Sequence, residues 1–216
     1  MIPAIRALPR EPDAHVEPES DYGPSLRTAL ERRADVYLRA LPELARSEDL
    51  ARCAHLLVHT LRHDGKILVA GNGGSAAEAQ HFAAELVGRF SRERCGYPVM
   101  ALTTDTSILT AIANDYAYAD VFARQVEAHG RPGDLLLLFT TSGESENIVR
   151  AAHAARRRAM TVVTLTGSRR SRVGRCADVV VRMPTCETPV VQELQMALTH
   201  ALCGIVEDAL AEEDEA

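Results

Sequence analysis

The chain has 216 residues, of which 46% are hydrophobic and 25% are charged. This length suits one hydrophobic core with flanking helices, and the composition excludes a collagen-like or intrinsically disordered protein. The formal net charge of −6 leaves no broad basic surface for a nucleic-acid backbone, so we expect no nucleic-acid partner.

The sequence contains neither a membrane-length apolar run nor a secretion signal. No stretch of about eighteen apolar residues occurs, and no basic region followed by an apolar core opens the chain. The five cysteines are scattered and never spaced as CxxC, which disfavours a disulfide framework and a cysteine zinc site. We therefore expect a cytoplasmic protein with reduced cysteines and no membrane association.

The N-terminal part is predicted to contain an arm and two helices. Residues 1–24 hold five of the ten prolines and no apolar periodicity, so they are interpreted as a Pro-rich arm. A helical pattern covers Ser25–Leu41, up to Pro42. A second helix begins at Ser47, a favourable N-cap followed by two acids, and ends at Gly65.

Short apolar runs that alternate with helical stretches follow Gly65. Such runs are typical of strands buried on both faces, and the alternation indicates βαβ units, a parallel sheet and helices on both of its sides. The last helix begins near Pro189 and runs to about Ala211, so we expect a single domain over 25–211 and an acidic tail over 212–216. The expected strands are Lys66–Ala70, Pro98–Leu102, Leu135–Phe139, Thr161–Leu165 and Val179–Val181.

The glycine-rich loop after the first strand is a candidate anion site. Ligands of open parallel sheets bind beyond the carboxyl ends of the strands, and this loop opens directly into a helix N-terminus. The loop also fits the loose dinucleotide pattern GxGxxA. A nicotinamide enzyme would need an acid at the end of the next strand, where Thr103 and Thr104 stand and Asp105 lies too far along, so NAD binding is disfavoured. The residues of interest are Asn72, Gly73, Gly74 and Ser75.

Four hydroxyl side chains follow the strand that ends at Phe139, at the start of another helix. Hydroxyl and amide donors together with the helix dipole can hold a phosphate dianion without lysine. The alternative is a simple Ser-capped helix. Because a glycine loop follows another strand, phosphate binding is the better interpretation for Thr140, Thr141, Ser142 and Ser145.

Two pairs of polar residues on helices could bind a metal. His81 and Glu85 are four residues apart on one helix face, a spacing that allows a shared ion or substrate but is also common in helix-stabilising pairs. Gln192 and His200 on the last helix are separated by roughly 12 Å. Both can bind one ion only if their side chains extend toward each other or if different subunits supply them.

Four blocks of this sequence closely resemble those of phosphoheptose (sedoheptulose 7-phosphate) isomerases. They are GNGGSAAEAQHFAAELVGRF, LTAIANDYAYADVFARQVEAHGRPGD, TTSGESENIVRA and ETPVVQELQMALTHALCGIVE, and the resemblance extends from about Arg27 to Leu210. It implies the SIS-type fold, a five-stranded parallel sheet in a three-layer α/β sandwich. It also implies a homotetramer with active sites at subunit boundaries, a small sugar phosphate as substrate, and one Zn²⁺ per subunit.

The resemblance also implies roles for individual residues. The substrate loop falls on Asn72, Gly73, Gly74 and Ser75, a further substrate contact on Asn114 and Asp115, and the phosphate loop on Thr140, Thr141, Ser142 and Ser145. The implied zinc ligands are His81, Glu85, Gln192 and His200, of which Glu85 and Gln192 also contact substrate.

The sequence departs from the family pattern in its second loop. Thr140 stands where the family often has serine, which keeps the hydroxyl. Glu144 stands where the family usually has asparagine, so an acid lies beside the expected phosphate site. Its side chain must point away, or phosphate affinity must suffer.

A second function class shares part of this pattern. Relatives with the same fold bind the replication initiator protein and regulate chromosome replication without isomerase activity. They generally lack the acid at the position of Glu85 and the histidine at the position of His200, and both are present here. The isomerase is therefore the favoured hypothesis, and the non-catalytic regulator is the alternative.

The isomerase hypothesis requires a proton to move between C1 and C2 of a ketose through an enediol. Glu85 is the candidate base and His200 the candidate acid, while zinc would polarise the carbonyl and the adjacent hydroxyl. A carboxylate bound tightly to zinc is a poorer base, so the two roles of Glu85 compete.

Overall fold

The computed structural model describes residues 21–214, with side chains up to 211. The chain divides into two compact units, Met1–Asp35 and Val36–Ala216. The expected Pro-rich arm lies almost wholly outside the described residues, and the expected domain boundaries at residues 25 and 211 stay predictions. No helix in the described part is long and apolar enough to cross a membrane.

The first two helices form where the sequence predicts them, with a difference at Pro42. Helix α1 covers Gly23–Leu44 and continues through Pro42 instead of ending before it. A proline in the last turn removes only one hydrogen bond and has a helix-compatible φ, so the helix tolerates it. Helix α2 covers Glu48–Arg62, and the Ser47 side chain accepts a hydrogen bond from Leu50 N as the expected N-cap.

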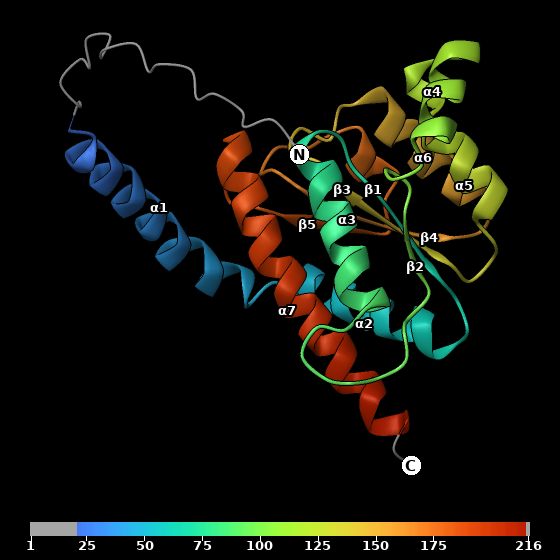
Figure 1. Ribbon diagram of the computed structural model, residues 1–216, viewed down its shortest axis with the longest axis horizontal. Coiled ribbons are helices and arrows are strands. Elements are labelled where there is room, and N and C mark those ends of the chain that lie inside the picture. The colour runs from blue at the N-terminus through green and yellow to red at the C-terminus, as the bar shows by residue number, and fades with distance from the viewer. Residues whose placement is uncertain (1–20, 215–216) are drawn as a thin grey trace, which may run out of the picture. The chain divides into compact units, whose positions relative to one another are not determined.

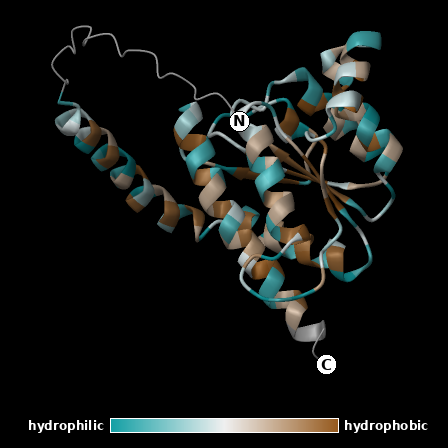
Figure 2. Ribbon diagram, in the orientation of Figure 1, coloured by the Kyte–Doolittle hydropathy of each residue, from teal (hydrophilic) through white to brown (hydrophobic). Residues whose placement is uncertain are grey.

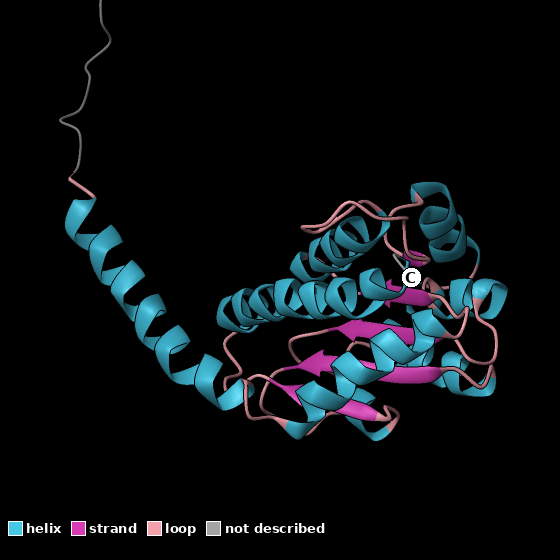
Figure 3. Ribbon diagram, turned by 90° about the horizontal axis from the view of Figure 1, so that it is seen from below, coloured by secondary structure: helices cyan, strands magenta, loops and turns pink. Residues whose placement is uncertain are grey.

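The sheet has five parallel strands in the order β2-β1-β3-β4-β5. Figure 3 shows the strands in magenta with helices packed around them. The strand bounds differ from the expected runs by no more than one residue at either end, which confirms the predicted parallel α/β sheet. The strands are β1 (Ile67–Ala70), β2 (Val99–Ala101), β3 (Leu135–Phe139), β4 (Thr161–Thr166) and β5 (Val179–Arg182).

Successive strand residues point to opposite faces, and each face has its own buried cluster. In β3, Leu135 and Leu137 pack against α2, α3 (Gly74–Val87) and α7 (Thr188–Asp214), while Leu136 and Leu138 pack against α5 (Ala123–His129) and α6 (Glu146–Arg157). The hydrophobic strands therefore lie between two helical layers (Figures 1 and 2). The remaining short elements are α4 (Thr106–Asp115), η1 (Tyr118–Asp120) and η2 (Val173–Arg175).

The last helix is longer than the sequence predicts. Helix α7 ends at Asp214 rather than near Ala211, so the described part of the acidic tail is helical. Val206 and Leu210 are buried and fix the preceding turns. Extending a formed helix adds one hydrogen bond per residue without a new nucleation cost, so the acidic residues continue the helix.

Candidate active site

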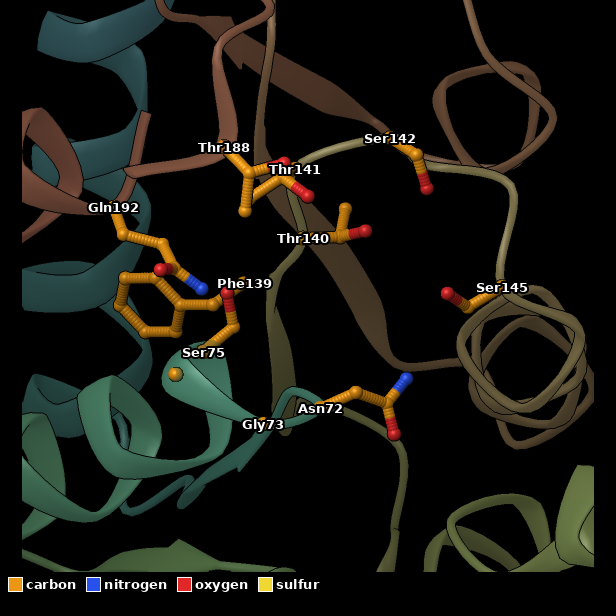
Figure 4. Close-up of a pocket in the computed structure, with 11 residues that line it drawn as sticks. Asn72, Gly73, Ser75, Phe139, Thr140, Thr141, Ser142, Ser145, Thr188 and Gln192 are labelled. Atoms are coloured by element: carbon orange, nitrogen blue, oxygen red, sulfur yellow. The ribbon is translucent and has the colours of Figure 1, made fainter. Parts of the chain in front are cut away.

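A cavity of about 320 Å³ lies between the loops that follow β1 and β3 (Figure 4). These strands are neighbours, but the helices that follow them cover opposite faces of the sheet, so the loops diverge at a topological switch point. Both predicted loops meet here. The lining residues are Asn72, Gly73, Gly74, Ser75, Phe139, Thr140, Thr141, Ser142, Ser145, Thr188 and Gln192.

The first loop needs glycine for its backbone conformation and its tight packing. Gly73 has a φ of 58°, in the left-handed region that favours glycine. A Cβ on Gly71 would lie 2.2 Å from the backbone oxygen of Ser75, so only glycine fits this turn. The Asn72 side chain exchanges hydrogen bonds of 2.9 and 2.8 Å with Asn147 of α6, which ties the first loop to the helix after the second.

The second loop presents hydroxyls that the protein does not use for capping. Gly143 has a φ of 67°, and its N–H donates to the Thr140 hydroxyl over 3.1 Å. Ser145 occupies the N-cap position of α6, yet its side chain makes no capping hydrogen bond, unlike that of Ser47. The Ser145 hydroxyl instead points toward Thr140 and Asn72 (Figure 4). It therefore remains available to a ligand.

Among the described residues, no charged side chain lines this cavity. The Glu144 carboxylate accepts a hydrogen bond of 2.9 Å from Arg172 N, and Glu144 does not line the cavity, which agrees with the first of the two alternatives for this acid. The remaining donors are hydroxyls, amides and the positive end of the α6 dipole. These groups favour a phosphate dianion at the helix N-terminus.

A second polar cluster joins α3 to α7. His81 Nε2 lies 2.9 Å from His200 Nε2 and 3.2 Å from Glu85 Oε1. Ligand atoms of all three side chains lie within 4.8 Å of one another. Two imidazoles and a carboxylate at this spacing suit a divalent cation such as zinc, so the residues present fit a metal site.

Comparison with known proteins identifies the family. The SIS domain family model matches residues 33–167. A phosphoheptose isomerase from Rhodospirillum rubrum is 46% identical over 185 residues, which cover 86% of this chain and 97% of the relative. One from Thiobacillus denitrificans is 52% identical over 162 residues, covering 73% of this chain and 81% of the relative.

The chain belongs to the phosphoheptose isomerase family of SIS domain proteins. Solved phosphoheptose isomerases have the same fold. The Francisella tularensis structure has a TM-score of 0.79 and 34% identity over 86% of this chain and 97% of the other. The Neisseria gonorrhoeae structure has a TM-score of 0.78 and 40% identity over 85% and 99%. The chain is therefore an isomerase, and its relatives favour this function over the non-catalytic regulator.

The structure separates the four implied zinc ligands of this phosphoheptose isomerase family member. His81, Glu85 and His200 meet in one cluster, while Gln192 lines the cavity. A Cβ on Gly74 would lie 2.5 Å from Gln192 Nε2, so the amide rests directly on the start of α3. Gly74 precedes His81 by seven helical residues, about 10 Å. Within one chain, Gln192 therefore belongs to the cavity.

Two further residues implied by the phosphoheptose isomerase resemblance lie elsewhere. Asn114 and Asp115 are exposed at the end of α4, where the Asn114 amide donates to the Asp115 carboxylate over 2.8 Å. Neither residue lines the cavity of the described chain. A role in substrate binding stays a prediction for both.

The structure adds residues that the sequence analysis missed. Thr188 and Asn147 stand in the first turns of α7 and α6. Their position as polar residues at a helix start was the sequence signal that could have identified them. Glu78 gave no such signal because its burial depends on how α3 packs. It is 4% exposed, and burial raises its pKa to about 7 against a smaller lowering by the Ser75 side chain.

Proposed function

We propose that this chain converts sedoheptulose 7-phosphate to D-glycero-D-manno-heptose 7-phosphate through an enediol. The uncharged, hydroxyl-lined cavity between the two loops carries this proposal, because it suits the phosphate of a sugar phosphate. The names of the relatives agree with this substrate class. The expected cytoplasmic location stays a prediction.

The phosphate would bind at the second loop and the sugar along the first. Thr140, Thr141, Ser142 and Ser145 surround the start of α6, while Asn72, Gly73, Gly74 and Ser75 form the facing wall. Gln192 lies beside the first loop and would contact the sugar hydroxyls, since its amide can both donate and accept hydrogen bonds. Asn114 and Asp115 are proposed as further substrate contacts.

Replacing Ser142 and Ser145 together with alanine should raise KM for the phosphorylated ketose by about 10²-fold. Each lost hydrogen bond to a charged group is worth about 1.5 to 3 kcal/mol. The cost to folding should be small, because Ser142 is exposed and the Ser145 side chain makes no capping hydrogen bond. Steady-state kinetics and inhibition by inorganic phosphate measure the effect, with the melting temperature as a folding control. An unchanged KM and unchanged phosphate inhibition would mean that the phosphate binds outside the second loop.

We assign the metal site to His81, Glu85 and His200, with Zn²⁺ as the ion and one ion per subunit. Zinc in such a site acts as a Lewis acid on a carbonyl and an adjacent hydroxyl. Gln192 is the implied fourth ligand but lies about 10 Å along α3 in the same chain. We therefore propose that Gln192 and the cavity of one subunit meet the cluster of another.

Glu85 and His200 would carry out the proton transfers. Glu85 is the base that takes the proton from the carbon next to the carbonyl, and His200 acts as acid at the oxygen. Their side chains both contact His81, so one substrate carbon and its oxygen can lie within reach of both groups. The His81 contact also limits how freely either side chain rotates.

Solvent exchange tests the function directly. Incubating the protein with sedoheptulose 7-phosphate in deuterated water should label the carbon-bound position, as followed by NMR, because an enediol exchanges its proton with solvent. Chelator treatment should abolish both labelling and turnover, and zinc should restore them. Full activity in metal-free protein, verified by elemental analysis, would exclude the metal role, and no exchange with any ketose phosphate would favour the non-catalytic regulator.

We expect the chain to form a homotetramer. Leu26, Leu30 and Leu38 of α1 are 61%, 68% and 74% exposed. An apolar groove of about 500 Å³ lies between α2 and α7, lined among others by Leu50 and Ile205. Apolar surface of this kind is typical of subunit contacts. Light scattering should give four times the chain mass, whereas a fully active monomer at micromolar concentration would contradict shared active sites.

A further inference from the structure

The connection between α3 and β2 is fixed by a buried carboxylate of α7. Glu207 is fully buried, and its carboxylate accepts hydrogen bonds of 2.7 to 3.1 Å from Phe90 N, Ser91 N and Oγ, Arg92 N and Arg94 Nε. The connection has no regular structure of its own here, so these contacts determine its path. We call this arrangement the Glu207–Arg94 latch.

Arg94 links the latch to the end of α3. Its side chain is 1% exposed, and besides Glu207 it donates to the backbone oxygens of Glu85, Leu86, Gly88 and Cys95 over 2.9 to 3.0 Å. A buried ion pair is costly unless its hydrogen-bonding groups are satisfied, and here they are. The latch therefore ties the last turn of α3, which carries Glu85, to α7.

The latch also places an aromatic ring against His200. Phe90 N is held by Glu207, and the Phe90 ring stacks on the His200 imidazole with centroids 5.8 Å apart and planes at 29°. The Phe90 ring also lies near Gly204 of α7, where a Cβ would be 3.5 Å from Phe90 Cε1. Phe90 thus packs on one turn of α7, against His200 and Gly204.

His200 has few other constraints on its orientation. Among the described residues, its imidazole makes one hydrogen-bonding contact, with His81 Nε2, and its Nδ1 has no partner. Metal-binding histidines are usually oriented by a hydrogen bond from the second ring nitrogen. In its place, His200 has the face of Phe90.

We propose that Phe90, held by the Glu207–Arg94 latch, is the positioning residue that orients the His200 imidazole toward His81. This inference rests on the proposed role of His200 in the active site. Stacking restricts rotation of the imidazole about its side-chain bonds, which keeps Nε2 directed at the cluster before any ligand binds. Phe90 itself touches neither substrate nor metal.

Three variants of the full-length protein test the role of Phe90. Phe90→Leu keeps an apolar side chain but removes the aromatic face, and Phe90→Tyr keeps the face. Phe122→Leu is the matched control, because it removes a buried ring from the cluster on the face of the sheet opposite α7. The readouts are zinc affinity by chelator competition, the visible spectrum of the cobalt-substituted protein, kcat, KM and melting temperature.

Phe90→Leu should weaken zinc binding by about 10-fold or more, alter the cobalt spectrum and lower kcat with little change in KM. Phe90→Tyr should keep wild-type values, and Phe122→Leu should leave zinc affinity unchanged even where it lowers the melting temperature. Wild-type zinc affinity and kcat in Phe90→Leu would overturn the inference, as would equal losses of zinc affinity in Phe122→Leu. If the wild-type protein binds no zinc, the proposed metal site is wrong, and the kcat of Phe90→Leu alone decides the positioning role.

Discussion

Glu85→Gln should leave a folded protein with turnover and solvent-proton exchange reduced by about 10² to 10⁴-fold, the usual cost of a missing general base. This corresponds to about 3 to 5 kcal/mol of transition-state stabilisation. Glutamine nearly preserves the volume and still accepts hydrogen bonds, but it takes no proton at neutral pH. The backbone oxygen of Glu85, which accepts from Arg94, is unaffected by the substitution.

The measurements for Glu85→Gln are kcat, deuterium exchange by NMR, zinc content and melting temperature. Glu127→Gln is a suitable control, because it also removes a carboxylate. Glu127 lies on α5, its side chain is 48% exposed, and it pairs with Arg157 of α6. Retention of more than roughly a tenth of wild-type exchange would show that Glu85 has only a structural or metal-tuning role, since loss of a general base lowers the rate far more.

His200→Asn should also strongly reduce turnover but leave some exchange at carbon if His200 acts at oxygen.

Glu207→Ala should destabilise the fold by about 3 to 5 kcal/mol, because it leaves the buried Arg94 side chain and three backbone N–H groups without their acceptor. For a chain of this size the loss corresponds to a fall in Tm of roughly 10 °C. Thermal unfolding followed by circular dichroism measures it. Asp208→Ala is the matched control, since the Arg92–Asp208 pair is 50% and 63% exposed and should be worth less than about 1 kcal/mol.

The same carboxylate should make stability depend on pH. Burial alone would raise the pKa of Glu207, but hydrogen bonds from Ser91, Arg92 and Phe90 outweigh burial and lower the pKa to about 2, from 4.5. The contribution is therefore complete above about pH 5 and is lost as the pH falls toward 2. The Tm difference between wild type and Glu207→Ala should shrink over this range, and a constant difference would contradict the lowered pKa.

Local sequence determined the elements and the two loops of the site. Strand β3 was predicted to the residue, because five consecutive apolar residues between turn signals have few alternatives. Gly73 and Gly143 adopt positive φ in the loops that were predicted to bind the substrate, and Ser47 caps α2 as expected. Such features depend on backbone conformation and hydrogen bonds within a few residues, so one segment suffices to predict them.

Only the tertiary structure decided which distant residues meet. The packing of α3 against α7 sets Gly74 beside Gln192 and His81 beside His200. A sequence spacing fixes positions within one helix but not the register between two helices, which buried side chains on both determine. The Glu207–Arg94 latch likewise joins segments 113 residues apart in the chain, and nothing near either residue indicates its partner. The sequence by itself therefore determined the fold class, the family and the candidate groups, while long-range packing decided that three of the four candidate metal ligands form one cluster and that Gln192 lines the cavity between the two loops.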